Sequence, residues 1–166
     1  MTFSVTKSYL STVAGLAYQK GLLRLDEKLK DYIKDGKFSS EHNKKITWHH
    51  LLNQSSQWKG NLFGTFDWAD RPPRNLSIEE LKAQEIPGPG EAYKYNDVRV
   101  NLLSFSLLNV LEESLPEVLK REIMDPIGAS SSWNWYGYEK SKILLNGEIF
   151  GSVSGGGHFG GGLFIN

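Results

Sequence analysis

Apolar residues near the start of the chain recur at the spacing of one helical face. After Ser4 they form a single stripe: Val5, Tyr9, Leu10, Val13, Leu16 and Ala17. Gly21 follows, and glycine commonly ends a helix because it adopts the left-handed conformation at little cost. The pattern therefore predicts a helix that begins near Ser4 and ends near Gly21.

A second long helix is predicted from Asp97 to about Glu113. Its apolar positions keep the same period: Val98, Leu102, Phe105, Leu108 and Leu111. Thr47 and Ser77 are suited to cap the starts of two shorter helices, and Glu80 would complete a capping box with Ser77. Shorter helices are expected at residues 46–52, 77–84 and 115–124, and a short amphipathic turn or helix is expected at residues 23–33.

The periodicity changes late in the chain. The segment "WNWYGY" (133–138) indicates a strand, and "ILLNGEIF" (143–150) indicates a hairpin with Asn146 and Gly147 at its turn. Residues 53–76 are rich in aromatic side chains and contain "RPPR", which predicts an ordered loop. The chain is therefore expected to be mostly helical, with a little β-structure near its end.

Composition and charge narrow the possible functions. The 166 residues suffice for one domain with its own core. Lys plus Arg and Asp plus Glu both number 19, so no charge surplus points to a nucleic-acid partner. The absence of cysteine excludes thiol catalysis, disulfides and cysteine metal sites. No apolar run approaches the ~18 residues of a membrane span.

Ser4 and Lys7 are the first candidates for chemistry. Side chains three positions apart share a helix face, so Lys7 can reach the Ser4 hydroxyl. A serine becomes a useful nucleophile when a neighbouring base takes its proton. A chain of this composition holds about one Ser-x-x-Lys match by chance, and Ser56 with Lys59 forms a second one. The alternative reading of Ser4 and Lys7 is an ordinary helix start.

Tyr95 is the third candidate. It follows the turn "PGPG" (87–90) and precedes the helix at Asp97, a position from which it could share proton transfer with Lys7. The alternative is that Tyr93 and Tyr95 are packing aromatics.

Taken together, the order of segments resembles the serine β-lactamase and penicillin-binding-protein superfamily. The segments are Ser-x-x-Lys on a helix, then "LDEKLKDYI", "ITWHHLL", "PGPGEAYKYND", "IMDPIGASSSW" and a glycine-rich loop. The nearest branch is the class C β-lactamase-related group, which includes carboxylesterases, D-aminopeptidases and 6-aminohexanoate-dimer hydrolases. The resemblance implies an α/β (α+β) β-lactamase/transpeptidase-like fold, an antiparallel sheet flanked by helices with a helical subdomain. It implies that Ser4 is the acylated nucleophile and that Lys7 and Tyr95 are its catalytic partners.

Two departures from the family pattern affect the expected substrate. Asp97 stands where the family's Tyr-x-Asn motif has asparagine, and a carboxylate cannot donate the hydrogen bond that the amide gives to a β-lactam substrate. The family's third motif, Lys/His-x-Gly on a strand, has only a letter match at "HFG" (158–160). We interpret that match as part of the glycine-rich segment instead. Asp97, His158 and Trp135 are the expected substrate-binding residues, whereas His50 is expected to make a structural hydrogen bond.

The expected activity is acyl transfer by a serine hydrolase acting on a small-molecule ester or amide, with no metal or cofactor. The alternatives are a non-catalytic binding module of the same fold and a peptidoglycan DD-peptidase. Residues 1–166 are expected to form a partial domain, because the family places strands before the nucleophile and half of the sheet after the glycine-rich segment. On that expectation this chain alone has little activity.

Overall fold

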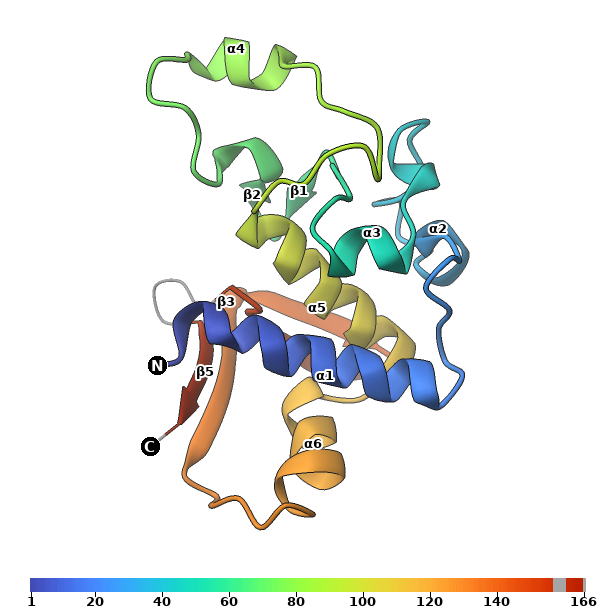
Figure 1. Ribbon diagram of the computed structural model, residues 1–166, viewed down its shortest axis with the longest axis vertical. Helices are drawn as coiled ribbons and strands as arrows, with labels where there is room; N and C mark the ends of the chain where they lie inside the picture. The colour runs from blue at the N-terminus through green and yellow to red at the C-terminus, as the bar shows by residue number, and fades with distance from the viewer. Residues whose placement is uncertain (157–160, 166) are drawn as a thin grey trace.

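Two long helices and a three-stranded sheet form the frame of the protein, as Figure 1 shows. The computed structural model describes residues 1–156 and 161–165. The helices are α1 (Thr6–Gln19), α2 (Leu29–Tyr32), α3 (Trp48–Leu52), α4 (Ile78–Ala83), α5 (Asp97–Leu111) and α6 (Leu115–Leu119). Shorter helical turns are η1 (Phe3–Val5), η2 (Asn43–Lys45), η3 (Asp67–Ala69) and the π-helical η4 (Lys120–Met124). The strands are β1 (Asn61–Leu62), β2 (Thr65–Phe66), β3 (Trp133–Leu145), β4 (Glu148–Val153) and β5 (Gly162–Ile165).

Helix α5 lies at the centre of the core. Leu102, Leu107 and Leu108 are fully buried, because α5 contacts α1, α3 and β4 at once. The Asn96 side chain caps its start by accepting the N–H of Arg99 at 3.0 Å. The helix predicted from Asp97 is therefore confirmed, and it ends two residues before the expected end.

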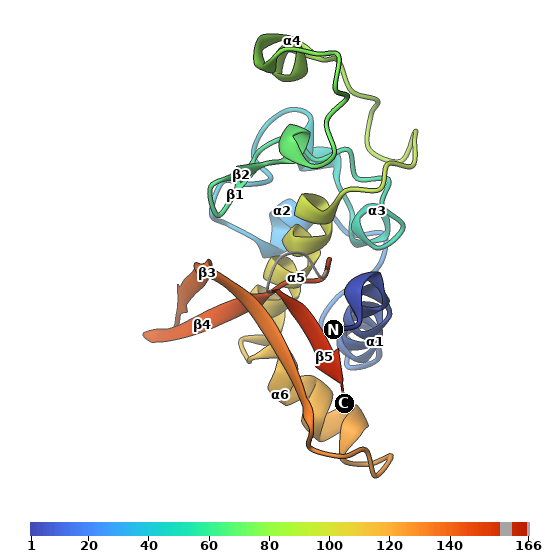
Figure 2. The same ribbon diagram turned by 90° about the vertical axis from the view of Figure 1, so that its left-hand side faces the viewer.

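The sheet has strand order β4-β3-β5, and both pairings are antiparallel. The predicted hairpin is confirmed: Leu145 pairs with Glu148, and Asn146 and Gly147 both have positive φ, as a two-residue hairpin turn requires. The pairing of β3 with β4 shifts between Gly137 and Lys142. This β-bulge moves residues 138–141 out of the regular ladder. Helices α1, α5 and α6 pack on the same side of the sheet (Figure 2).

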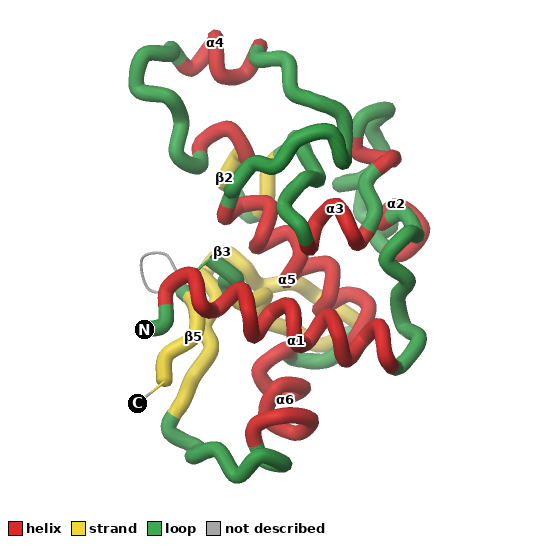
Figure 3. The backbone as a smooth tube through the Cα atoms, viewed as in Figure 1, coloured by secondary structure: helices red, strands yellow, loops and turns green. Residues whose placement is uncertain are grey.

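The upper part of the molecule is built largely from loops, with α2, α3, α4 and the β1–β2 hairpin among them (Figure 3). The capping boxes at the starts of α3 and α4 are present, with Thr47 and His50 in one and Ser77 and Glu80 in the other. The Thr47 N–H donates to His50 Nδ1 at 3.2 Å, which confirms the structural hydrogen bond expected of that histidine. The loop expected at 53–76 includes the β1–β2 hairpin and η3, which its sequence did not indicate.

None of the described helices has both the length and the apolar character needed to cross a bilayer.

Candidate active site

Ser4 lies in the turn η1, directly before α1, and its side chain is exposed. It was expected in the first α-helical turn, but the preceding residue, Phe3, has φ 47° and η1 is a 3₁₀ turn. Two threonines fix this segment to β5: Thr2 donates its N–H to the Leu163 carbonyl at 2.8 Å, and the Leu163 N–H donates to Thr6 Oγ1 at 3.2 Å. The sheet therefore holds the position of the exposed serine from both sides.

Ser4, Lys7 and Tyr95 meet at one point. The Ser4 Oγ and Tyr95 Oη atoms are 2.5 Å apart and share a hydrogen bond in which either oxygen can donate. Lys7 Nζ donates to Ser4 Oγ at 3.5 Å and lies 4.6 Å from the centre of the Tyr95 ring. The structure thus brings together three side chains that the sequence separates by up to 91 positions.

The loop that precedes α5 delivers Tyr95 to this point. Its backbone is held by the loop after α3: the Lys94 N–H donates to the Gln54 carbonyl at 3.0 Å. The Gln57 side-chain amide donates to the Ala92 carbonyl at 2.8 Å. These two bonds fix the backbone on either side of Tyr93, and this fixed backbone positions the Tyr95 side chain next to Ser4.

A buried arginine at the start of α5, Arg99, links the loop after α3 to the turn η3 through hydrogen bonds. Arg99 donates to the Trp58 carbonyl at 3.0 Å, to Gln57 Oε1 at 3.0 Å and to Asp67 Oδ2 at 3.2 Å. Its side chain is 2% exposed, and that of Asp67 is 6% exposed. Burial lowers the pKa of Arg99, and the charge of Asp67 opposes that effect. Asn96 adds a bond to the Asp67 carbonyl at 2.8 Å, so the loops and the start of α5 form one polar network.

Asp97 completes the site. Lys7 Nζ lies 2.7 Å from its Oδ1, and Arg71 Nη2 lies 2.6 Å from its Oδ2. Burial alone would raise the pKa of Asp97, but Lys7 and Arg71 outweigh burial and hold the pKa below its usual value. The carboxylate is therefore ionised near neutral pH, and its two oxygens face two cations.

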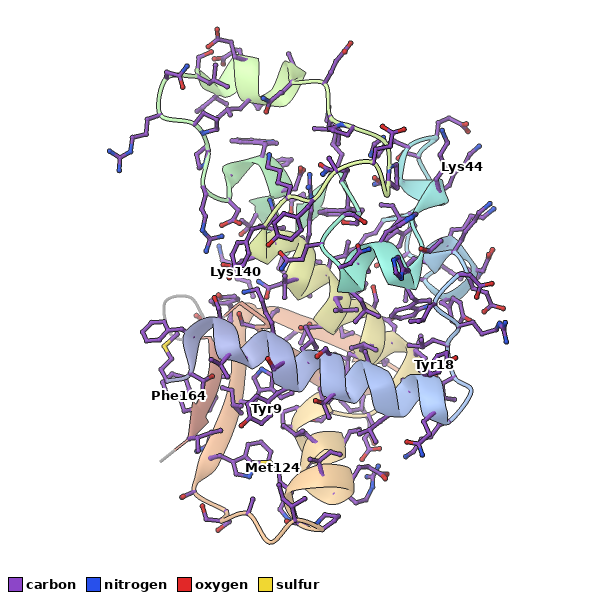
Figure 4. All side chains as sticks on the ribbon, viewed as in Figure 1. Tyr9, Tyr18, Lys44, Met124, Lys140 and Phe164 are labelled. Atoms are coloured by element: carbon purple, nitrogen blue, oxygen red, sulfur yellow. The ribbon has the colours of Figure 1, made fainter. Side chains whose placement is uncertain are left out.

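A pocket of about 600 Å³ opens beside Asp97. Its lining is more apolar than polar, with the apolar part supplied by Leu62, Phe63, Ala69 and Val98. The bulge of β3 forms another part of the wall through Tyr138, Glu139 and Lys140. Lys140 lies where the sheet meets the upper part of the molecule, as Figure 4 shows. The pocket has the size and character of a site for a small organic group.

The other expected residues lie elsewhere. Ser56 of the second Ser-x-x-Lys match is fully buried, and its Oγ accepts the Trp58 N–H at 3.4 Å, so it is not accessible to a substrate. Trp135 is 5% exposed, donates to the Ser154 carbonyl at 2.9 Å and is not part of the pocket wall. It is a core residue here, in contrast to its expected place in the substrate cleft. His158 lies outside the described residues.

Sequence reasoning missed Arg71 and the bulge. Arg71 follows Asp70 in a proline-rich loop and gives no periodic signal, and its φ of 52° is unusual for a residue with a side chain. The bulge depends on Ser141, whose Oγ accepts the Tyr138 N–H at 2.9 Å and lies 2.7 Å from the Ser152 carbonyl oxygen. The polar run from Glu139 to Lys142, in the middle of a long strand, was the sequence signal available for it.

Comparison with known proteins identifies relatives of this arrangement. The Beta-lactamase family model matches residues 1–142. The octameric penicillin-binding protein homologue from Pyrococcus abyssi is 21% identical, with a TM-score of 0.60 over 97% of this chain and 40% of that one. The beta-lactamase/D-alanine carboxypeptidase from Yersinia pestis is 18% identical, with a TM-score of 0.59 over 97% and 48%.

The class C beta-lactamase from Rhodobacter sphaeroides is 21% identical, with a TM-score of 0.54 over 79% of this chain and 35% of that one. The chain spans less than half the length of each of these three solved structures. A comparison with curated proteins found no match. The three structures confirm the β-lactamase/transpeptidase-like fold class that the sequence predicted.

Proposed function

The chain belongs to the beta-lactamase family, a family of serine hydrolases, and on this premise we propose that it carries the reacting groups of an ester or amide hydrolase. Ser4 is the nucleophile, and Lys7 and Tyr95 transfer its proton. Because the chain spans less than half of its matched structures, we propose the activity for the protein made from its complete coding sequence.

One observation carries the proposal: the exposed Ser4 hydroxyl lies 2.5 Å from Tyr95 Oη and 3.5 Å from Lys7 Nζ. A nucleophile within hydrogen-bond reach of a proton acceptor, with a second group orienting that acceptor, is the arrangement that activates a serine. The buried Ser56 has neither an open approach nor a helical relation to Lys59, because Gln57 between them has φ 47°.

The reaction we propose has two halves. Ser4 Oγ attacks the substrate carbonyl carbon, and its proton passes to Tyr95 Oη, which acts as a phenolate beside the Lys7 cation. The negative charge that forms on the carbonyl oxygen is stabilised by the Ser4 backbone N–H. The carbon–oxygen or carbon–nitrogen bond then breaks, and the proton goes to the departing alcohol or amine. Water attacks the acyl-enzyme in the second half, which releases the carboxylic acid and restores the Ser4 hydroxyl.

The pocket beside Asp97 favours an apolar group on the substrate. Leu62, Phe63, Ala69 and Val98 supply its apolar wall. Asp97 offers a carboxylate in place of an amide donor, and its oxygens already face Lys7 and Arg71. We therefore propose an ester or amide with an apolar acyl group as the substrate, and we do not expect efficient β-lactam hydrolysis.

The test is turnover of p-nitrophenyl esters by the protein made from its complete coding sequence. Ser4→Ala is expected to lower turnover by about 10³-fold or more, since the sole nucleophile is lost. Ser8→Ala is the matched control, because Ser8 is an exposed serine on α1 and is expected to leave turnover unchanged. A protein that takes fluorescent penicillin covalently but leaves esters intact would indicate a DD-peptidase. One that reacts with neither would indicate a non-catalytic module.

A further inference from the structure

The Asp97 carboxylate is contacted from three directions, by Lys7, by Arg71 and by the backbone at Gly156. Its side chain is 7% exposed, and Lys7 and Arg71 approach its two oxygens at 2.7 Å and 2.6 Å. The chain at Gly156 closes over it: a Cβ atom at that position would lie 2.7 Å from Asp97 Cγ, too close to be accommodated without a shift. The carboxylate is therefore fixed by two cations and by a backbone that touches it.

The two cations on Asp97 are the same two that contact Tyr95. Lys7 Nζ lies 4.6 Å and Arg71 Cζ lies 4.9 Å from the centre of the Tyr95 ring, within the range of attraction between a cation and an aromatic ring. Arg71 is anchored on its other side by Asp70, whose oxygens accept from Nη1 at 2.9 Å and 2.7 Å. Asp70 in turn accepts the N–H of Asp97 at 2.7 Å. The contacts thus run in a closed circuit around the tyrosine.

We propose that Arg71 and Asp97 are a positioning pair: they fix Lys7 and Tyr95 around Ser4 and thereby set the rate at which Ser4 reacts. This inference rests on the proposed function. Arg71 itself lies in the left-handed backbone region, with φ 52°, a conformation that is costly for any residue other than glycine. In this conformation its guanidinium lies between Asp70 and Asp97. Arg71 also lines the pocket, so the same side chain is part of the pocket wall and lies against the Tyr95 ring.

The charges explain why both partners are needed. Two carboxylates, Asp70 and Asp97, face two cations, Lys7 and Arg71. Removing the charge of Asp97 leaves the two cations close together and frees Lys7 from its 2.7 Å anchor, so its 3.5 Å contact with Ser4 is no longer held. Removing Arg71 leaves Asp70 and Asp97 as neighbouring like charges and takes one cation from the Tyr95 ring.

The experiment compares four variants of the protein made from its complete coding sequence: Asp97→Asn, Arg71→Gln, Arg71→Lys and Arg74→Gln. Arg74 is the matched control, an exposed arginine three positions along the same loop. The readouts are kcat and KM for a p-nitrophenyl ester and the second-order rate of fluorophosphonate labelling, with near-UV circular dichroism as the check that each variant is folded. The side chain of Arg71 is 45% exposed, so Arg71→Gln is expected to fold even if Asp97→Asn does not.

Asp97→Asn and Arg71→Gln are each expected to lower kcat and the labelling rate about 10- to 100-fold with little change in KM, the scale of a misplaced reacting group. Arg71→Lys should recover only part of the loss. A lysine keeps the positive charge, but it lacks the two separate guanidinium NH₂ groups with which Arg71 bonds Asp70 and Asp97 at once.

Two results would overturn this inference while leaving the proposed function intact. In the first, the wild-type protein is labelled and Arg71→Gln is labelled at a rate within about twofold of the wild-type rate. In the second, Arg74→Gln loses as much activity as Arg71→Gln. Absence of labelling in the wild-type protein would instead overturn the proposed function, and this inference with it.

Discussion

The buried Arg99 network gives the sharpest prediction for stability. Arg99→Met removes three hydrogen bonds, to Trp58, Gln57 and Asp67, at a side chain that is 2% exposed. The methionine fills much of the volume, but the Asp67 carboxylate is left buried without its cation. Breaking a buried pair in this way costs about 3–5 kcal/mol.

The lower end of that range is the better expectation here, because Asp67 keeps a bond from the Gly60 N–H at 2.9 Å. A loss of about 3 kcal/mol corresponds to a fall in Tm of roughly 6–12 °C in a chain of this size. Urea unfolding followed by tryptophan fluorescence measures it, since the chain has five tryptophans and Trp58 lies in the network.

A double variant separates the charge from the packing. Arg99→Met with Asp67→Leu removes both charges, and we expect it to be more stable than Arg99→Met alone, since no unpaired carboxylate remains. Lys120→Met is the surface control: both side chains of its pair with Asp125 are about half exposed, so solvent screens the pair and its loss should change stability little. A loss below about 1 kcal/mol in Arg99→Met, or additive effects in the double variant, would refute the reasoning.

Three further predictions follow from the site and its surroundings. We expect nitrocefin turnover to be slow or absent beside ready ester turnover, because Asp97 cannot donate as an amide does; comparable rates on the two substrates would contradict this. Gly156→Ala should slow fluorophosphonate labelling, since its Cβ would lie 2.7 Å from Asp97 Cγ, whereas Gly151→Ala meets nothing within 4 Å and should not; equal labelling in the two variants argues against the close approach. Burial and the charge of His49 lower the pKa of His50 below 6.5 in the folded protein. As the pH falls, the unfolded chain therefore binds this proton before the folded chain does. The free energy of unfolding should fall as the pH is lowered from about 7.5 to about 5.5. His50→Asn should flatten that part of the pH dependence, and an unchanged slope in the variant would exclude His50 as its source.

Much of the frame could be predicted from sequence because its signals are local. The period of apolar residues identified α5, the caps at Thr47 and Ser77 marked two helix starts, and Asn146-Gly147 marked the hairpin turn. The meeting of Ser4, Lys7 and Tyr95 was predicted by a resemblance of whole segments rather than by spacing, since Tyr95 is remote in sequence from the other two.

The parts that escaped prediction depend on contacts between distant loops. Arg71 reaches Asp97, 26 positions along the chain, from a loop residue with the unusual φ of 52°. Trp135 resembles a cleft aromatic in sequence, yet the pairing of β3 with β5 turns it into the core. Neither propensity nor periodicity records which loop a side chain will meet, so such residues become visible only in three dimensions.

The identity of the nucleophile can be decided by locating the covalent bond that a fluorophosphonate forms with the protein made from its complete coding sequence. Intact mass gives the number of adducts, and fragmentation of the labelled peptides gives their positions. We predict one adduct, on Ser4, which is lost in Ser4→Ala and kept in Ser56→Ala. No adduct on the wild-type protein, or an adduct on a serine other than Ser4, would contradict the assignment.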